Sequence, residues 1–358
     1  MKIISLFPTS FLLVIALSLI CGLIALIINP NLNLVYATNS LSQSIQHNQQ
    51  DLQSTINDEV KQTITNTIQS INNNNTNNGI TLINNTEPKK VTVGDIEVTY
   101  KILGKGEPIL LISGSGNVMD VWPSYLLQEL SKDHQVIIFD NRGVGNTTSG
   151  IKLFSIEQFA NDTAGLMDAL EIQKADVIGF SMASFIAQQL TLTHPEKVNR
   201  LILYGASCGG QESIPQNANV VNALSDFVNN RTVDVNAFQS VTFPPEWIKE
   251  NPKYLDTIPK TSEMVPSTTL KKQFEINEEW LSKNWNGVCN QLTKITQPTL
   301  IITGTADVAI PAANSLILVD KIPGAWLVQI KEAGHGLMYQ FPEKFTTIVE
   351  TFLNESEN

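Results

Sequence analysis

Apolar and polar positions divide the chain into three stretches of different character. From Phe11 to Ile28 no residue is charged, and an apolar run of this length can span a bilayer. From Thr38 to about Pro88 the sequence is rich in Asn and Gln, a composition that cannot build a packed core. From Lys89 onward, short β-branched runs alternate with helical periodicity. We therefore expect an N-terminal membrane or signal segment, a polar tether and one α/β domain, at residues 1–30, 31–88 and 89–358.

The length of the N-terminal apolar run favours an uncleaved membrane anchor over a cleaved signal peptide, which has a shorter apolar core. Val35 and Ala37 nevertheless form the small-residue pattern of a cleavage site. Lys2 is the only Lys or Arg before residue 61, and this bias predicts that the rest of the chain lies outside the cytoplasm. The α/β domain is thus expected to be membrane-anchored outside the cytoplasm, or secreted if the segment is cleaved.

The tether contains apolar residues that recur mostly at steps of four. Each such step turns a helix by about 40°, so the apolar stripe drifts around the helix and makes no continuous seam. This pattern indicates a partly helical tether, and it leaves open a weak membrane-surface or self-associating helix.

The α/β domain is expected to begin with a hairpin around Gly94 and Asp95, because these turn residues separate two β-branched runs. Continuous apolar runs then predict the buried strands of a mainly parallel sheet. We expect these strands at Ile109–Ile112, Val136–Phe139, Asp176–Gly179, Arg200–Tyr204, Thr299–Thr303 and Ala325–Ile330. Helices are expected between them, at Ser155–Leu170, Met182–Leu192, Ala312–Lys321 and Pro342–Leu353.

A long interval without any strand pattern separates Tyr204 from Thr299. From about 210 to 291 the sequence is rich in aromatic residues, and its helical pieces are bounded by prolines. This pattern predicts a helical lid inserted into the sheet domain. The lid aromatics are expected to form mostly the lid's own core, with some of them facing a pocket.

Composition and charge exclude several classes of function. The formal net charge is −11, which disfavours binding to a polynucleotide, so no nucleic-acid partner is expected. The three cysteines form no CxxC pair and have no His nearby, so we expect neither a metal nor a redox cofactor. Cys208 and Cys289 flank the lid. They could pair if its two ends meet, but we interpret them as two free thiols.

Ser181 lies in the sequence Gly-Phe-Ser-Met-Ala-Ser, at the point where a predicted strand meets a predicted helix. A nucleophile on such a sharp turn is exposed above the sheet. Ala183 occupies the position of the second Gly in the strict GxSxG pattern, so the motif alone is weak. The alternative is that Ser181 merely caps the helix.

Histidines and acidic residues at the strand ends decide between these two interpretations. The chain has four His. His47 lies in the tether, and His134 and His194 lie at the far ends of their elements, which leaves His335 directly after the last strand. Asp307 follows the preceding strand. The order Ser181, Asp307, His335 is that of a nucleophile, an acid and a base.

These segments together resemble those of a lidded α/β-hydrolase, from about Lys89 to Asn354. Ser113-Gly114-Ser115-Gly116 resembles the family's His-Gly loop, and Asp140 to Gly145 resembles its Asp-x-Arg-Gly-x-Gly turn. Asp307 to Pro311 resembles its acid loop. Two residues depart from the family pattern. Ser113 replaces the His that braces the loop. Ala183 replaces a Gly and adds a methyl group where the strand and the helix pass close to each other.

The resemblance implies a serine hydrolase that works through an acyl-enzyme. Ser181 would attack, His335 would move the proton, Asp307 would hold the imidazole, and the backbone N–H groups of Ser115 and Met182 would hold the oxyanion. No cofactor or metal is implied. The aromatic lid favours as substrate a small or medium hydrophobic ester, lactone or thioester.

Two alternative functions remain open. An aminopeptidase-type amide hydrolase would need lid carboxylates to hold an ammonium group, and Glu275, Glu278 and Glu279 could provide them. A non-catalytic ligand-binding receptor could use the same fold, although the intact set of three residues favours an enzyme.

Overall fold

The computed structural model describes residues 86–230, 235–253 and 264–355. Every described residue belongs to one compact unit, which spans residues 75–358. The expected membrane segment and most of the tether therefore lie outside the described residues. Within the described residues, no helix is long and apolar enough to cross a membrane.

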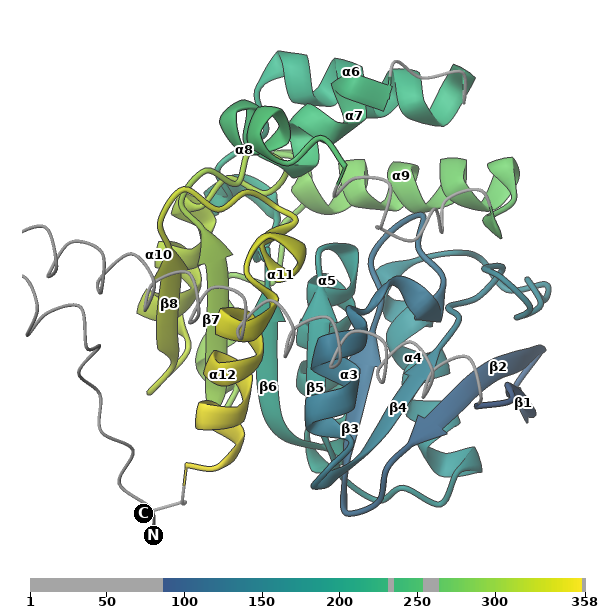
Figure 1. Ribbon diagram of the computed structural model, residues 1–358. Helices are drawn as coiled ribbons and strands as arrows, with labels where there is room; N and C mark the ends of the chain where they lie inside the picture. The colour runs from purple at the N-terminus through teal and green to yellow at the C-terminus, as the bar shows by residue number, and fades with distance from the viewer. Residues whose placement is uncertain (1–85, 231–234, 254–263, 356–358) are drawn as a thin grey trace, which may run out of the picture. The chain divides into compact units, whose positions relative to one another are not determined.

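An eight-stranded, mostly parallel sheet forms the centre of the domain (Figure 1), as the alternation of apolar runs predicts. The strand order is β1-β2-β4-β3-β5-β6-β7-β8. Pairing is antiparallel from β1 to β4 and parallel across all remaining neighbours. The strands are β1 (Lys89–Val93), β2 (Ile96–Leu103), β3 (Glu107–Ile112), β4 (His134–Phe139), β5 (Ala175–Phe180), β6 (Val198–Tyr204), β7 (Thr299–Gly304) and β8 (Trp326–Ile330).

Helices cover both faces of this sheet (Figure 1), because the central strands are apolar on both sides. One core contains α4 (Ile156–Ala169), α5 (Met182–Thr193) and α10 (Ala313–Lys321). The other contains α3 (Ser124–Leu130), α11 (Leu337–Gln340) and α12 (Pro342–Leu353). The Ser155 side chain caps α4 by accepting a 3.0 Å hydrogen bond from the Gln158 backbone N–H. The short helices α3 and α11 were not predicted from the sequence.

The interval between β6 and β7 folds into the expected lid, which crosses the carboxyl ends of the parallel strands (Figure 1). Its helices are α6 (Ala218–Asn230), α7 (Val235–Thr242), α8 (Pro245–Glu250) and α9 (Ser267–Leu281). Trp280 attaches α9 to the sheet domain. Its ring stacks on Phe185 of α5 at 5.0 Å, and its indole N–H donates to the Ser207 carbonyl. Trp280 therefore packs on the sheet domain, whereas the sequence analysis expects most of the lid aromatics to form the lid's own core.

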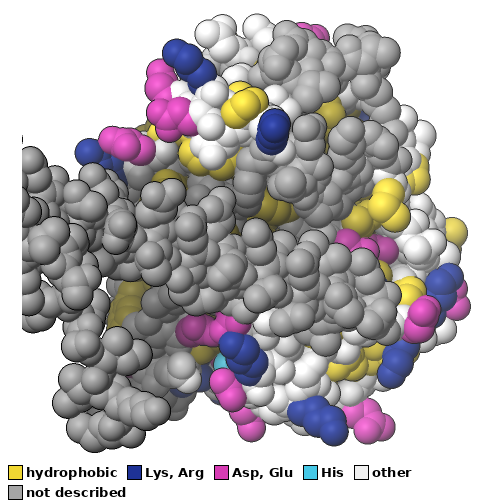
Figure 2. Space-filling model, viewed as in Figure 1, with side chains coloured by type: hydrophobic (Ala, Val, Ile, Leu, Met, Phe, Trp, Pro, Cys, Tyr) yellow, Lys and Arg dark blue, Asp and Glu magenta, His cyan; other side chains and the backbone are white. Residues whose placement is uncertain are grey.

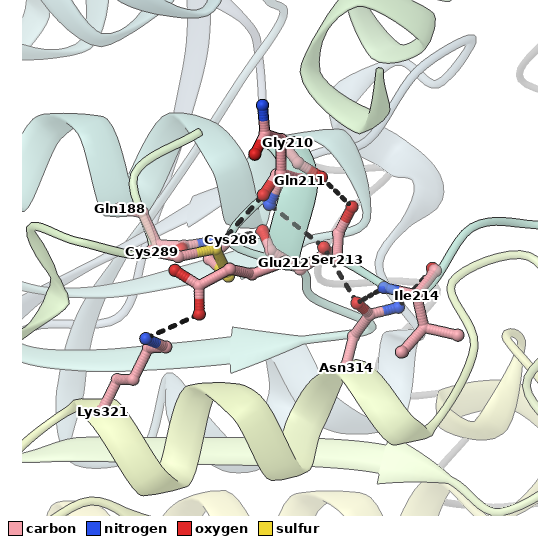
Figure 3. Close-up of a disulfide and its surroundings, with 12 residues drawn as sticks. Gln188, Cys208, Gly210, Gln211, Glu212, Ser213, Ile214, Cys289, Asn314 and Lys321 are labelled. Carbon is pink, nitrogen blue, oxygen red and sulfur yellow. Dashed lines mark hydrogen bonds and ion pairs between the residues drawn. A yellow bond between two sulfur atoms is a disulfide. The ribbon is translucent and has the colours of Figure 1, made fainter. Parts of the chain in front are cut away.

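Cys208 and Cys289 form a disulfide, so the prediction of two free thiols is wrong (Figure 3). The pairing brings together two residues that are 81 positions apart in the sequence, with Cα atoms 4.9 Å apart. Cys208 follows β6 and Cys289 precedes β7, so the bond joins the point where the chain enters the lid to the point where it leaves. Both residues are buried.

The first residues of the lid are also attached to α10 (Figure 3). Glu212 forms a 2.8 Å ion pair with Lys321. The Asn314 side chain accepts from the Ile214 N–H at 2.8 Å and donates to the Ile214 carbonyl at 3.0 Å. The base of the lid is thus held to the sheet domain by covalent, ionic and hydrogen-bond contacts.

Candidate active site

Ser181 sits on a sharp turn between β5 and α5, in a backbone conformation that L-residues rarely adopt (φ 57°, ψ −123°). Such a conformation costs on the order of 1–3 kcal/mol and is typical of functional turns. The surrounding contacts hold it in place. The Ser181 N–H donates to the Tyr204 carbonyl at 3.0 Å, and the Ser181 carbonyl accepts from the Ser184 N–H at 2.8 Å and from the Ser184 hydroxyl at 2.6 Å.

The helix-cap alternative for Ser181 receives no support from the geometry. The Ser181 side chain makes no capping hydrogen bond to α5, all of whose residues are described. The turn is tight because strand and helix touch directly. A side chain on Gly179 would come within 2.3 Å of the Ala183 carbonyl oxygen. The methyl group of Ala183 itself is fully buried, so the departure from the GxSxG pattern is accommodated.

His335 and Asp307 form a hydrogen bond of 2.8 Å between Nδ1 and Oδ2. The Asp307 carboxylate is completely buried, and its other oxygen accepts from the Ile310 N–H at 2.9 Å. This arrangement fixes the orientation of the imidazole, because one ring nitrogen is committed to the acid. Gly205 makes room for the pair, since a Cβ there would lie 2.9 Å from His335 Cε1 and 3.5 Å from Asp307 Oδ2.

The aromatic residues at the ends of β5 and β6 bring this pair beside Ser181. Phe180, the residue before Ser181, stacks on Tyr204 at 4.7 Å and lies 5.0 Å from the His335 ring. The Tyr204 hydroxyl donates to the His335 carbonyl. Burial, and next the charge of Asp307, raise the pKa of Tyr204 well above its usual value, so the phenol stays protonated and able to donate. Ser181 and His335 therefore share their immediate neighbours.

The loop after β3 lies against the same turn and contains Ser115. A Cβ on Gly114 would fall 3.0 Å from Ser181 Cβ. The sequence identifies no side chain that supports this loop, because Ser113 replaces the family's His. The structure shows another brace. The Asn141 amide donates to the Ser113 carbonyl at 2.9 Å, and the Asn117 amide donates to the Ser115 carbonyl at 2.9 Å.

The residue after Asn141 is a buried arginine, which fixes the turn after β4. Arg142 forms ion pairs with Asp95 at 2.8 Å and with Asp162 at 2.6 Å. The hydrogen bonds from Arg142, ahead of all other causes, hold the pKa of Asp95 well below its usual range. The network ties the β1–β2 hairpin and α4 to the turn that braces the loop after β3. Arg142 and Asp162 are both buried, so removing either one would leave the other charge without its partner, which is strongly destabilising.

The remaining candidate residues lie elsewhere. His134 begins β4, and His194 directly follows α5, where it contacts Asn161, so both lie at the opposite end of the sheet from Ser181. His47 is outside the described residues. Glu275, Glu278 and Glu279 are exposed on the outer face of α9. Within the part of the chain that the structure describes, no group of three or more His, Cys, Asp or Glu side chains is arranged to hold a metal ion.

The sequence matches the family model of the alpha/beta hydrolase fold over residues 107–342. This range contains the Ser181 turn, Asp307 and His335, and it covers more than half of the chain. The chain belongs to the alpha/beta hydrolase fold family.

Several relatives of this alpha/beta hydrolase have hydrolase names, and others are named bromoperoxidases. The chain is 28% identical over 266 residues to a protein of Azorhizobium caulinodans named "Putative carbamate hydrolase RutD", covering 73% of this chain and 97% of that protein. It is 27% identical over 282 residues to the 2-hydroxymuconate semialdehyde hydrolase of a Pseudomonas species, covering 75% and 94%. Among solved structures, the enol-lactonase from Burkholderia xenovorans is 25% identical with a TM-score of 0.63, covering 75% and 100%. The family and these relatives support a hydrolase and leave its substrate open.

Proposed function

We propose that this protein is a serine hydrolase that cleaves a small or medium hydrophobic ester, lactone or thioester through an acyl-enzyme. The observation that carries the proposal is the strained Ser181 turn next to a buried Asp307–His335 pair, on one edge of the sheet. A serine is a weak nucleophile unless a base removes its proton, and a base works best when a third group orients it.

In the proposed reaction, Ser181 Oγ attacks the acyl carbon while His335 Nε2 accepts the hydroxyl proton. The His335 imidazolium formed in this step then donates the proton to the leaving oxygen or sulfur, and Asp307 stabilises the charged ring. The backbone N–H groups of Ser115 and Met182 hold the negative oxygen of the tetrahedral intermediate. Water, deprotonated by His335, attacks the acyl-enzyme and releases the carboxylic acid and free Ser181. No step requires a cofactor.

Apolar contacts near the site favour a hydrophobic acyl group over a charged one. Val118 and Val144 of the sheet domain pack with Val265 and Leu270 of the lid beside the loop that contains Ser115. The lid carboxylates that an aminopeptidase would need are exposed on the outer face of α9. Relatives named as an enol-lactonase and a semialdehyde hydrolase are compatible with small acyl substrates.

A panel of chromogenic esters, lactones and aminoacyl amides tests this choice of substrate. We expect kcat/KM to be highest on esters or lactones with short to medium aliphatic acyl chains, because apolar side chains line the contact between lid and sheet. Aminoacyl amides are expected to be poor substrates. A clear preference for amides with a free amino group would contradict the proposal and favour the aminopeptidase alternative.

We also propose that the domain lies outside the cytoplasm, anchored by its N-terminal segment or secreted after cleavage. The Cys208–Cys289 disulfide supports this placement, since structural disulfides persist in oxidising compartments. Protease added to intact cells should degrade or release the domain while a cytoplasmic marker protein stays intact. A domain that is protected until the cells are lysed would contradict the proposed location.

A further inference from the structure

Helix α9 of the lid presents one face to the loop after β3. Leu270, Gln273 and Asn277 are spaced by three and four residues, so they lie on the same side of the helix. Leu270 and Gln273 are completely buried. Two of the three side chains are amides, in contact with the loop that contains Ser115.

Each amide makes a direct hydrogen bond to this loop. Gln273 Oε1 accepts from the Gly116 backbone N–H at 2.8 Å, and Asn277 Nδ2 donates to Ser115 Oγ at 2.7 Å. The Ser115 hydroxyl in turn donates to Met182 Sδ at 3.1 Å. A continuous chain of contacts therefore runs from the lid to Ser115 and on to Met182. These are the two residues whose backbone N–H groups are the proposed oxyanion donors.

The orientation of the Gln273 amide is fixed by chemistry. A backbone N–H can only donate, so the group facing Gly116 must be the carbonyl oxygen of Gln273. In the contact with Ser115 Oγ, the amino group of Asn277 donates, which leaves the single hydroxyl proton of Ser115 for Met182. The Gln273 amide cannot rotate by half a turn without losing its bond to the loop.

The other half of each amide is buried without a partner. Gln273 Nε2 and Asn277 Oδ1 make no hydrogen bond within the described residues. Burying an unpaired amide atom is unfavourable, and an apolar side chain of similar length would avoid that cost. Packing alone therefore does not account for two amides on this face of α9, whereas their bonds to the loop do.

We propose that Gln273 and Asn277 are positioning residues through which the lid sets the spacing of the two oxyanion donors. The inference rests on the proposed function, because it concerns the oxyanion hole of that reaction. It assigns the lid a part in the rate of the chemical step, in addition to any part in selecting the substrate. An oxyanion donor that is displaced by a fraction of an ångström loses much of its effect on the transition state while substrate binding is little changed.

The test compares variants of the full chain on the ester that it hydrolyses best. Gln273→Met keeps the length of the side chain but removes the acceptor, and Asn277→Leu removes the donor. Each is expected to lower kcat by roughly tenfold to a hundredfold, with KM changed by less than about threefold. Glu278→Gln, on the exposed face of the same helix, is the matched control and should keep the wild-type kcat.

A transition-state analogue separates positioning from a purely structural role. A boronic acid forms a tetrahedral adduct with the active serine, so its affinity should fall in each variant in parallel with kcat/KM. The affinity for a non-hydrolysable amide of the same acyl group should stay unchanged. The melting temperature should also stay within about 3 °C, because one hydrogen bond is lost while one unpaired amide is removed.

The possible outcomes separate this inference from the proposed function. If the wild type hydrolyses esters and both variants keep its kcat and its boronic acid affinity, the positioning role is overturned while the proposed function stands. If kcat falls only together with the melting temperature, the role is structural and the inference is likewise overturned. A wild-type chain that hydrolyses no ester or lactone overturns both.

Discussion

Replacing Ser181 with Ala is expected to lower kcat by about ten-thousandfold or more while the fold is retained, and His335→Ala is expected to do the same. The two side chains would act as one unit, so the double variant should lose little more than either single variant. Steady-state kinetics on the best ester measures the loss. Circular dichroism and thermal melting check that each variant is folded. Ser181→Ala is expected to melt as the wild type does, and His335→Ala at a lower temperature, because it leaves the buried Asp307 carboxylate without its partner.

His194→Ala provides the matched control for the histidine variant. His194 directly follows α5 at the opposite end of the sheet from Ser181, so its removal should leave kcat within about twofold of the wild type. A Ser181 or His335 variant that keeps more than about a hundredth of the wild-type kcat would show that the nucleophile or the base has been wrongly assigned.

Loss of the Cys208–Cys289 disulfide is expected to lower the free energy of unfolding by about 4 kcal/mol. The bond closes a chain segment of 81 residues, and the entropy that a cross-link removes from the unfolded chain grows with the length of the closed loop. Denaturant unfolding of the wild type and of Cys208→Ala/Cys289→Ala, each with and without reductant, measures this difference. Reductant should destabilise the wild type and leave the double variant unchanged.

Thiol titration of the denatured full chain gives an independent check on the pairing. The chain has three cysteines, and Cys21 has no partner left once Cys208 and Cys289 are paired. One thiol should react before reduction and three after it. Three reactive thiols without reductant would contradict the disulfide, and Cys21→Ser should lower both counts by one.

The strands and the order of the site residues could be predicted from the sequence, because both depend on local patterns. Buried parallel strands such as β3 and β5 are continuous apolar runs. Ser181 directly follows β5, and Asp307 and His335 lie in the loops after β7 and β8. The residue that ends a parallel strand must lie at the carboxyl edge of the sheet. Tertiary packing did not need to be known to place these three residues together.

The disulfide and the lid contacts could not be predicted, because they depend on which distant segments meet. Cys208 follows the small residues Ala206 and Ser207, and such a position suits a buried free thiol equally well. Cys289 lies beside it only because the chain leaves the lid close to the point where it enters. Gln273 and Asn277 are ordinary polar positions of an amphipathic helix in the sequence. Their heptad-like spacing with Leu270 shows a shared face but not the loop that this face touches.

The hydrogen bond that supports the loop after β3 could not be predicted for the same reason. The resemblance to the family indicates that Ser113 replaces the His whose side chain usually supports this loop. It does not indicate which other side chain supports the loop here. In the structure Asn141, from the turn after β4, donates to the Ser113 carbonyl. The contact joins residues 28 positions apart, so it became visible only when β3 and β4 were placed side by side.

Labelling with a fluorophosphonate probe tests the central claim most directly, because the probe forms a bond only with a serine that a base has activated. Mass spectrometry of the intact chain should show a single adduct, and peptide mapping should place it on Ser181. Ser181→Ala should remain unlabelled, His335→Ala should label much more slowly, and His194→Ala should label as the wild type does. An unlabelled wild-type chain, or an adduct on any other serine, would contradict the proposed catalytic site.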